Sequence, residues 1–277
     1  MIVSASDVSA VLPDQACQFD RILALEGEVY RNVAGRKTLR FSRDGKSYFL
    51  KVHLGVGWKE IVKNLVQLRL PIVSAGTEWR ALHRLKELQI ETITPVAYGC
   101  EGWNPARLRS FLITEDLGET VMLSDLLSEW KRKPLTSPDA VRLKRALLEK
   151  IASIARTLHQ NGVNHRDFYL CHFRMPIKEL NVVAPQNVRV YVMDLHRAQL
   201  RSRTPQRWVI KDLGSLFFSA LDLDFTQRDF YRFMRVYRNR PLREILTRES
   251  RFWRRVKTRA RRIYARHQGL RSRKAYS

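Results

Sequence analysis

The sequence has few of the features that mark exported or membrane-spanning proteins. Its three cysteines, Cys17, Cys100 and Cys171, are odd in number and widely spaced, so neither a disulfide framework nor a zinc site built on cysteine pairs is supported. No apolar run approaches the ~18 residues that a transmembrane helix needs. Residues 1–20 contain no lysine or arginine, which disfavours a secretory signal. We expect a protein of a reducing, cytoplasmic compartment.

Acidic residues are also scarce. The 277 residues include 27 Asp and Glu against 51 Lys and Arg, which gives a net charge of +24. Such an excess of positive charge indicates an anionic partner, and the candidates are nucleic acid, an anionic membrane, an acidic protein, and a phosphorylated or acidic ligand. Because hydrophobic residues make up 44% of the chain, we expect a folded protein in spite of this charge.

The first half of the chain has the pattern of short strands. Segments 38–41 and 48–52 lie on either side of Asp44-Gly45, a dipeptide that strongly favours a hairpin turn. The apolar run 111–113 is a further strand candidate. We therefore expect the first half to be rich in strands.

The second half is mostly helical. The clearest helix begins at Ser137-Pro138, a good N-cap followed by proline at the first helical position, and an apolar stripe continues to Asn161-Gly162. Farther on, three valines alternate as in a strand that ends at Asp194, namely Val188, Val190 and Val192.

This change of pattern predicts the organisation of the chain. We expect an α+β protein with a strand-rich lobe over residues 1–114, a connector over residues 115–118 and a larger helical lobe over residues 119–277.

Two charged residues occupy positions where apolar residues are expected. Lys51 lies within the apolar strand, and Glu78 shares a helix face with Leu82 and Leu85. An inward carboxylate costs several kcal/mol unless a cation meets it, and Lys51 is a sensible partner. The alternatives are a lysine that protects an edge strand and a glutamate that is favoured by the helix dipole.

Two further carboxylates stand at places that suit chemistry. The tripeptide His165-Arg166-Asp167 directly follows the long predicted helix, in a loop before another apolar segment. Asp194 stands at a strand end, and carboxylate oxygens are ligands that Mg²⁺ prefers. Each is weak alone, because the tripeptide can arise by chance and Asp194 can be a turn residue.

The order of Lys51, an inward Glu78, Asp167 and Asp194 across the two halves resembles the protein kinase-like fold. The resemblance implies that Lys51 holds the α- and β-phosphates of ATP and pairs with Glu78. It also implies that Asp167, with Arg166 beside it in the catalytic loop, accepts the proton of the attacking hydroxyl. Asp194 would hold Mg²⁺.

The same resemblance assigns roles outside the catalytic loop. The connector would be the hinge whose backbone meets adenine, so that Glu115 and Leu117 bind the cofactor. Asp212 stands at the start of the predicted large buried helix, where the family's aspartate bonds the catalytic-loop backbone. We therefore expect a structural role for Asp212.

The sequence also departs from the protein kinase pattern. His172 stands where kinases have a metal-binding asparagine, and imidazole is a poor Mg²⁺ ligand. Either one metal ion suffices or His172 acts by hydrogen bonding, and a metal role for His172 stays an alternative. Leu195 and His196 replace the Phe-Gly after Asp194, which makes regulated loop flipping unexpected. No glycine-rich phosphate loop precedes Lys51.

These departures point to a narrower family. The strings HRDFYLCHF, DLHRAQ, KDLGSLFFSAL and FLITEDL are very similar to those of the WaaP family of lipopolysaccharide core heptose(I) kinases, and the resemblance runs from about Gly27 through the basic tail. It implies ATP-dependent phosphorylation of the first inner-core heptose at its 4-hydroxyl, on the cytoplasmic face of the inner membrane.

The surface charge suits such an acidic glycolipid acceptor. In a kinase-like fold, the stretch after Asp194 borders the acceptor site, so carboxylated or phosphorylated core sugars would meet its arginines. The candidates are Arg197, Arg201, Arg203 and Arg207, with Lys211 following. The alternative is a solvated basic loop.

Two amphipathic segments suggest a peripheral position on the membrane surface. One is Trp58–Leu70, and the other is the basic tail, where apolar residues recur at helical spacing from Phe252 to Tyr264. Either stripe can instead pack on the protein's own core. An acidic protein partner is a further possibility for so basic a chain.

Other classes explain less of the sequence. A nucleic-acid-binding protein would account for the arginines but not for the four kinase-like residues, so we expect no nucleic-acid partner. A protein kinase, including one that acts on tyrosine, and a small-molecule kinase of the antibiotic-modifying type share the fold. A catalytically inactive scaffold is disfavoured because every central polar residue is present.

Overall fold

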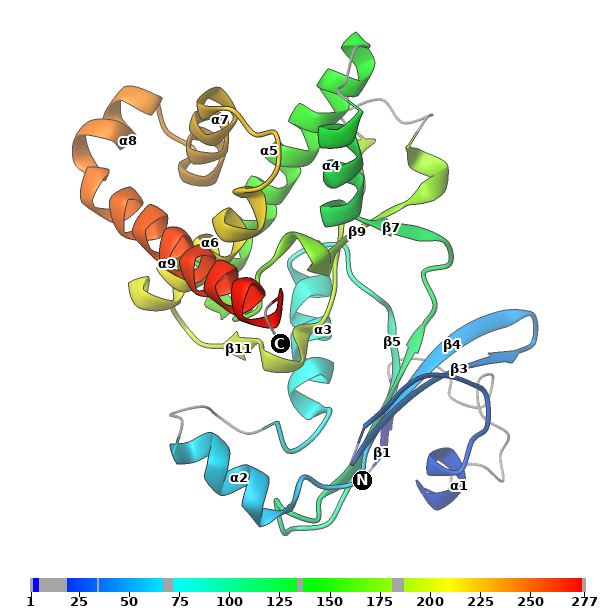
Figure 1. The fold of residues 1–277 in the computed structure, drawn as a ribbon. Helices are drawn as coiled ribbons and strands as arrows, with labels where there is room; N and C mark the ends of the chain where they lie inside the picture. The colour runs from blue at the N-terminus through cyan, green and yellow to red at the C-terminus, as the bar shows by residue number, and fades with distance from the viewer. Residues whose placement is uncertain are drawn as a thin grey trace. The chain divides into compact units, whose positions relative to one another are not determined.

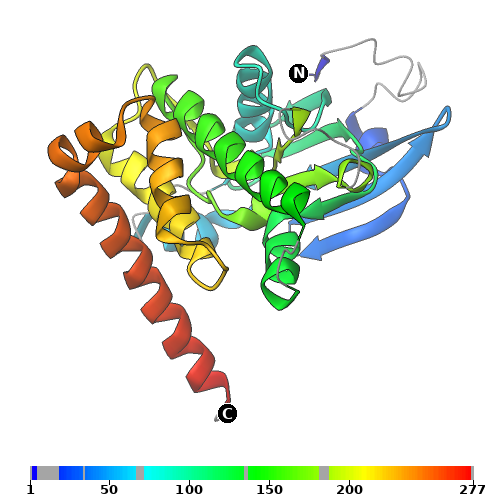
Figure 2. The same cartoon turned by 90° about the horizontal axis from the view of Figure 1, so that it is seen from above.

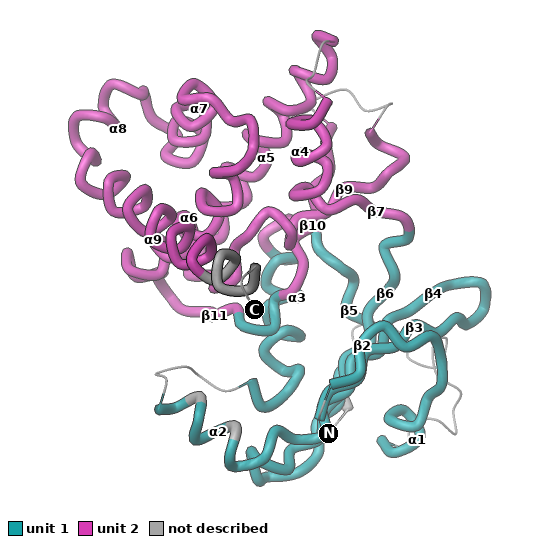
Figure 3. Tube along the Cα trace, viewed as in Figure 1, with its two compact units in different colours: residues 1–87, 92–118, 195–197 teal, residues 88–91, 119–194, 198–277 magenta. Residues whose placement is uncertain are grey.

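Figure 1 shows the computed structural model, which describes residues 2–4, 19–33, 35–66, 72–133, 137–180 and 187–275. The chain divides into two compact units, coloured separately in Figure 3. Unit 1 comprises Met1–Glu87, Thr92–Gly118 and Leu195–Arg197, and unit 2 comprises Leu88–Glu91, Glu119–Asp194 and Ala198–Ser277. The two units are therefore not separated by a single cut at the connector. Residues 88–91 belong to the helical unit, and residues 195–197 belong to the strand-rich unit.

Unit 1 is built on a six-stranded sheet whose neighbouring strands all pair antiparallel, in the order β1-β5-β6-β4-β3-β2. Its elements are β1 (Ile2–Ser4), α1 (Phe19–Leu23), β2 (Glu28–Val33), β3 (Arg36–Arg43), β4 (Lys46–His53), α2 (Gly57–Val66), α3 (Gly76–Glu87), β5 (Pro95–Glu101) and β6 (Arg109–Glu115). The hairpin predicted around Asp44-Gly45 is confirmed, because Arg43 pairs with Lys46 and both turn residues have positive φ.

The two faces of β4 have different tasks. Leu50 and Val52 are buried in one core cluster with Phe111 and Ile113 of β6, whereas Lys51 lies on the opposite face. Gly99 of β5 makes this packing possible, since a Cβ there would lie 2.2 Å from the Phe111 ring. The sheet thus buries one face for stability and presents Lys51 on the other.

Unit 2 is mainly helical. Its helices are α4 (Leu123–Arg132), α5 (Pro138–Gln160), α6 (Gln206–Ala220), α7 (Gln227–Arg238), α8 (Leu242–Arg248) and α9 (Ser250–Ala275). Two small sheets complete it, β7 (Thr120–Met122) with β9 (Phe173–Pro176) and β10 (Tyr191–Val192), and β8 (Val163–Asn164) with β11 (Gln199–Leu200). Strands in one part and helices in the other confirm the predicted α+β class.

The predicted start of the long helix is accurate, but one predicted strand is shorter than expected. The Ser137 side chain accepts a hydrogen bond from the Ala140 N–H at 3.1 Å, and Pro138 is the first residue of α5, as the sequence predicts. The strand expected over 188–192 is reduced to β10. Val188 and Val190 are buried without strand pairing, so their alternation reflects burial rather than a ladder.

The basic tail forms a long helix, and its apolar stripe belongs to the core. Phe252, Trp253, Val256 and Ala260 are all buried where α9 packs along α6, and Figure 2 shows α9 running on to the C-terminal end of the chain. Of the two alternatives for this stripe, the structure therefore selects packing on the protein itself. No helix in the described part of the chain is long and apolar enough to cross a membrane.

We predict that Gly162→Ala destabilises the protein by about 3 kcal/mol or more. Gly162 has φ +76°, and a Cβ there would lie 1.7 Å from the Arg201 carbonyl oxygen, so both conformation and space oppose a side chain. The free energy of unfolding from denaturant titration measures the effect. Gly45→Ala is the matched control, since its φ is +74° but nothing lies within 4 Å, and it should cost only about 1 kcal/mol. Equal effects at the two positions would contradict the steric argument.

Candidate active site

Unit 1 contributes a buried ion pair. Lys51 Nζ of β4 lies 2.5 Å from Glu78 Oε1 in the first turn of α3, and the Glu78 side chain is only 2% exposed. Ala81, Leu82 and Leu85 bury the same face of α3, as the spacing predicts. A carboxylate so buried is held by its cation, and in return it fixes the Lys51 ammonium in one position.

A neutral histidine lies near this pair. His53 ends β4 and is buried, and burial together with the positive charges of Arg36 and Lys51 lowers the pKa of His53 to about 4. The imidazole is therefore uncharged at physiological pH. His53 therefore adds no second positive charge that would compete with Lys51 for the Glu78 carboxylate.

The connector has one backbone donor to spare. The N–H groups of Glu115 and Asp116 donate to the Thr94 and Ser47 carbonyls, and the Gly118 N–H donates to the Asp116 carboxylate. Within 115–118, the N–H of Leu117 is the one for which the described residues supply no acceptor. Arg40 holds Asp116 from the side at 2.8 Å, so the connector is fixed while the Leu117 N–H stays available.

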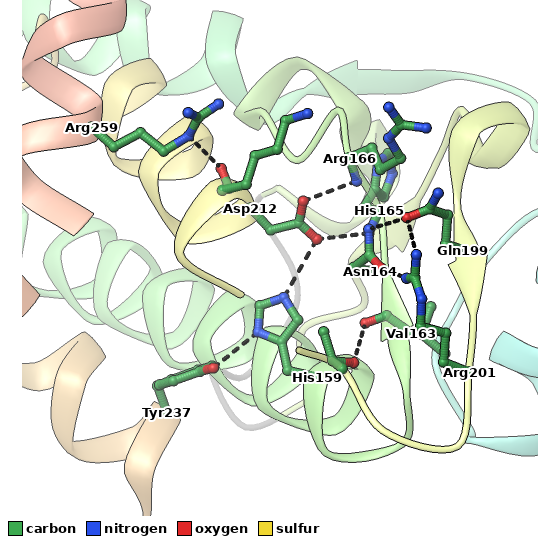
Figure 4. A network of polar contacts seen from close by, with 12 residues as sticks. His159, Val163, Asn164, His165, Arg166, Gln199, Arg201, Asp212, Tyr237 and Arg259 are labelled. Carbon is green, nitrogen blue, oxygen red and sulfur yellow. Dashed lines mark hydrogen bonds and ion pairs between the residues drawn. The ribbon is translucent and has the colours of Figure 1, made fainter. Parts of the chain in front are cut away.

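In unit 2, the catalytic loop is held by Asp212 of α6 (Figure 4). Asp212 is fully buried, and its carboxylate accepts the His165 N–H at 2.7 Å and the Arg166 N–H at 2.9 Å. The ring of His159 on α5 contacts the same carboxylate at 3.4 Å and the Tyr237 hydroxyl at 2.9 Å. The carboxylate therefore joins α5, α6 and the loop that carries Asp167.

His165 extends this network to the segment before Asp194. Burial lowers the pKa of His165, so its ring is neutral, and Nε2–H donates to the Met193 carbonyl at 2.9 Å. The Met193 N–H donates to the His172 carbonyl at 2.8 Å. Met193 is thus held through both its N–H and its carbonyl group. These two bonds fix the backbone that leads into Asp194.

His172 links the two carboxylate-bearing segments. Its Nδ1 lies 2.6 Å from the Asp167 carbonyl and its Nε2 lies 3.6 Å from Asp194 Oδ2. Burial opposes charge on the ring, but contacts with Cys171 and the Asp167 carbonyl and the charge of Asp194 raise the pKa of His172 to about 9. The contact between the ring Nδ1 and the Asp167 carbonyl favours the hydrogen-bonding alternative for His172.

Backbone strain marks the same two loops. Arg166 (φ +73°) and Asp194 (φ +59°) lie in the left-handed region, which non-glycine residues seldom adopt. The bonds from Asp212 to the Arg166 N–H and those that hold Met193 maintain these conformations. Such strain is concentrated at functional sites, where a side chain must point in an otherwise unfavourable direction.

Two of the expected acceptor arginines lie on one ring within unit 2. Arg201 and Arg207 both lie beside Trp208 in unit 2, whereas Arg203 is exposed and Arg197 belongs to unit 1. Trp208 itself was not singled out by sequence reasoning. The available signal was an aromatic residue inside the basic run RTPQRWVIK.

Unit 2 also encloses an apolar cavity of about 480 Å³ between α5, α6, α7 and α9. Its lining includes Leu148, Phe217, Phe230 and Val256. Sequence reasoning did not anticipate this cavity, because each lining residue alone has the pattern of ordinary core.

These features define a class of protein. A strand lysine paired with a helix glutamate, a connector with an available N–H, and an HRD loop held by a buried aspartate are the parts of a kinase of the protein kinase-like fold, an enzyme that uses ATP.

The comparisons identify the family within that class. The sequence profile of the lipopolysaccharide kinase (Kdo/WaaP) family matches residues 20–237. The lipopolysaccharide core heptose(I) kinase WaaP of Pseudomonas aeruginosa PAO1 is 46% identical over 250 residues, which cover 90% of this chain and 91% of the relative. An Escherichia coli protein of the same name is 46% identical over 84% of this chain and 85% of its own. This chain therefore belongs to the lipopolysaccharide kinase (Kdo/WaaP) family.

A solved structure agrees with this assignment. It is described as WaaP in complex with acyl carrier protein, is 40% identical in sequence, and superposes with a TM-score of 0.78 over 95% of this chain and 99% of that chain. The protein kinase-like fold predicted from the sequence is thus confirmed.

We predict that Asp212→Asn destabilises unit 2 by about 2–4 kcal/mol, because an amide NH₂ would replace an oxygen that accepts a backbone N–H in a fully buried position. Thermal and denaturant unfolding measure this. Asp222→Asn is the control, since its exposed carboxylate accepts only the Tyr264 hydroxyl, and it should change the free energy of unfolding by less than about 0.5 kcal/mol. Wild-type stability in Asp212→Asn would refute the anchoring role.

Proposed function

We propose that this chain transfers the γ-phosphate of ATP to the first heptose of the lipopolysaccharide inner core, at its 4-hydroxyl. The observation that carries the proposal is the 46% identity to proteins named lipopolysaccharide core heptose(I) kinase, spread over nearly the whole chain. The anchored HRD loop supports it, since a kinase of any acceptor needs this arrangement.

The residues that hold the nucleotide directly in this proposal all belong to unit 1. Lys51, oriented by Glu78, neutralises charge on the α- and β-phosphates, and the Leu117 N–H and the Glu115 carbonyl meet the adenine ring. Glu78 holds the Lys51 ammonium, and the hydrogen bonds of the Glu115 and Asp116 N–H groups fix the backbone of the connector. They therefore require little reorganisation when nucleotide binds.

Asp194 has the properties of a magnesium ligand. Its carboxylate is 40% exposed, oxygen-donating and placed by the fixed Met193 peptide. No group of three or more His, Cys, Asp or Glu in the described part of the chain could hold a metal alone. This suits Mg²⁺, which is bound through one or two carboxylates together with substrate phosphates and water. Bound Mg²⁺ would neutralise phosphate charge during transfer.

Asp167 is the proposed base. The acceptor oxygen bonds to the γ-phosphorus while the bond to the β–γ bridging oxygen breaks, which yields ADP and the phosphorylated heptose. A sugar hydroxyl has a pKa far above 7, so its proton leaves late, to the Asp167 carboxylate. The ring of His172 contacts the Asp167 carbonyl and the Asp194 carboxylate and so holds the two loops in register.

An acidic protein partner is part of the proposal. The related WaaP structure contains acyl carrier protein, and a chain with a net charge of +24 is electrostatically suited to an acidic carrier of that type.

A membrane surface is the second proposed partner. Ile61 of α2 is buried, whereas Trp58 (57% exposed), Val62 and Leu65 share an unburied face of the same helix. Lys59 and Lys63 are exposed next to that face, which is the arrangement of a helix lying in an anionic interface. The Gly57 N–H donates to the Ala106 carbonyl at 3.0 Å, so the loop with the 93% exposed Trp103 lies beside the start of α2.

This surface supports a peripheral position on the cytoplasmic face of the inner membrane, where the glycolipid acceptor would be presented. Of the predicted Trp58–Leu70 stripe, residues 67–70 lie outside the described part of the chain.

The reaction is tested with purified core lipopolysaccharide and ATP·Mg²⁺. We predict that mass spectrometry finds one added phosphate on the heptose with the wild type, and that Asp167→Asn lowers the rate by about 10²–10⁴-fold with little change in the affinity for ATP. Asp125→Asn, which changes an exposed carboxylate on α4, should keep the wild-type rate. No phosphate gain with any protein would reject the proposed acceptor.

The membrane surface is tested by vesicle flotation. We predict that the triple variant Trp58→Gln, Val62→Gln, Leu65→Gln binds phosphatidylglycerol-containing vesicles about tenfold more weakly or worse, because the exposed apolar face of α2 is lost. The double variant Ile177→Gln, Leu246→Gln, which removes exposed apolar side chains of unit 2, is the control and should bind like the wild type. Equal losses in both would show that α2 has no special part.

A further inference from the structure

Four positive charges surround one indole ring in unit 2. The Arg166 Cζ lies 5.3 Å from the centroid of the Trp208 ring, the Arg201 Cζ 5.7 Å, the Arg207 Cζ 5.5 Å and the Lys211 Nζ 4.8 Å. The face of an indole attracts cations, which explains why the side chains can gather there. Like charges about one ring nevertheless repel one another, and an anion bound among them would relieve that repulsion.

Two members of this cluster, Arg201 and Arg207, have no carboxylate partner among the described residues. The Arg201 guanidinium donates to two neutral amide oxygens, Asn164 Oδ1 at 2.5 Å and Gln199 Oε1 at 2.7 Å (Figure 4). Among the described residues, neither Arg201 nor Arg207 forms an ion pair with an Asp or Glu. The Asp212 carboxylate is directed to the backbone of the catalytic loop instead. The charges of Arg201 and Arg207 thus remain unneutralised by the protein.

Two uncharged features add to the positive potential. Helix α6 begins at Gln206 after Pro205, a residue without a side-chain acceptor, so the first-turn N–H groups and the positive end of the helix dipole are not capped by a side chain. The Trp208 Nε1–H is buried and lacks an acceptor among the described residues. A donor in that condition is satisfied when a ligand supplies an oxygen.

The cluster is rigid enough to be a binding site. Arg201 is fixed by its two amide partners, and its N–H donates to the Gly162 carbonyl at 2.9 Å. The Arg166 backbone is fixed by Asp212, and Lys211 is the residue before Asp212 on α6. Guanidinium groups held in advance bind carboxylate or phosphate with little entropic cost.

We propose that Trp208, Arg166, Arg201, Arg207 and Lys211 form an oxyanion site that binds an acidic substituent of the acceptor saccharide, a carboxylate or a phosphate, close in the chain to the proposed base. Arg166 carries the argument from a general anion to the acceptor, because it directly precedes Asp167. An anion held on Arg166 orients the sugar next to it for transfer. This inference rests on the proposed function, and it assigns Trp208 and Lys211 to the acceptor side of the reaction.

Binding is tested first without transfer. We predict that inorganic phosphate and glucuronate change the intrinsic tryptophan fluorescence of the full-length protein in a saturable way, whereas glucose does not. The change should be lost in Trp208→Ala and its affinity weakened about tenfold or more in Arg207→Gln. Arg254→Gln removes an equal charge from the exposed face of α9 and should leave the affinity unchanged. A response to glucose equal to that for glucuronate, or equal weakening in Arg254→Gln, would overturn the proposal.

Steady-state kinetics then test the role in catalysis. The acceptor is a deacylated core saccharide in three forms: untreated, carboxyl-reduced and dephosphorylated. We predict that removing the acidic group that the site binds raises the KM of the wild type for the acceptor about tenfold or more, with a smaller change in kcat. The treatment that has this effect shows whether the site binds the carboxylate or the phosphate. In Lys211→Gln, the ratio of the KM for the treated acceptor to the KM for the untreated acceptor should fall toward one. Trp208→Phe, which keeps an aromatic face, should recover most of the ratio that Trp208→Ala loses.

The outcomes separate this inference from the reaction itself. If the wild type transfers phosphate but is insensitive to both treatments of the acceptor, the oxyanion site is wrong and the proposed function stands. If anions bind at Trp208 but no saccharide is phosphorylated, the assignment of the site to an acceptor saccharide falls with the proposed function, and only an anion site remains.

Discussion

The active part of unit 2 depends on one buried carboxylate. Asp212 accepts two consecutive backbone N–H groups of the HRD loop while its other contacts reach α5. Since a buried carboxylate is tolerated only when its oxygens are satisfied, the loop and α6 stabilise each other. The positive φ of Arg166, the position of Asp167 and the guanidinium of Arg166 all follow from these two bonds. Gly214, near the middle of α6, leaves room for Arg259 of α9, so the tail helix packs directly behind this anchor.

The excess of positive charge has several distinct uses. Arginines on α9 surround a buried apolar stripe and keep a long core helix soluble on its outer side. Lys59 and Lys63 lie next to an exposed apolar face of α2. A third group gathers on the ring of Trp208. The net charge of +24 is therefore distributed over at least three surfaces with different chemistry. A count of charged residues cannot distinguish these surfaces.

The sequence was sufficient for local signals and for the chemistry of the central residues. The Asp44-Gly45 turn, the Ser137 cap and the inward position of Glu78 follow from short-range rules, and the structure agrees with each. Lys51 and Glu78 could be paired before the fold was known because a buried carboxylate needs a cation. The strand expected at 188–192 failed because alternation arises from burial as readily as from pairing.

What depends on packing between distant segments could not be predicted in this way. The tail and α2 have the same amphipathic pattern, but α9 buries its stripe and α2 does not. Nothing in the periodicity distinguishes them, since the difference lies in whether a partner helix is present. Trp208 becomes significant only when Arg166, more than 40 residues earlier, is brought to its ring. The cavity between α5, α6, α7 and α9 likewise exists only in the assembled helices.

The double restraint on Met193 has a consequence for inhibitor design. In a kinase whose aspartate at the position of Asp194 can swing outward, the swing would open a pocket behind it that an inhibitor could fill. Here such a swing would break the bonds that His165 and the His172 carbonyl make to Met193, while the following Leu195 is buried against α3. Compounds of that type should therefore find no room. Selective chemistry is better aimed at the Leu117 N–H and at the neighbouring surface of the connector.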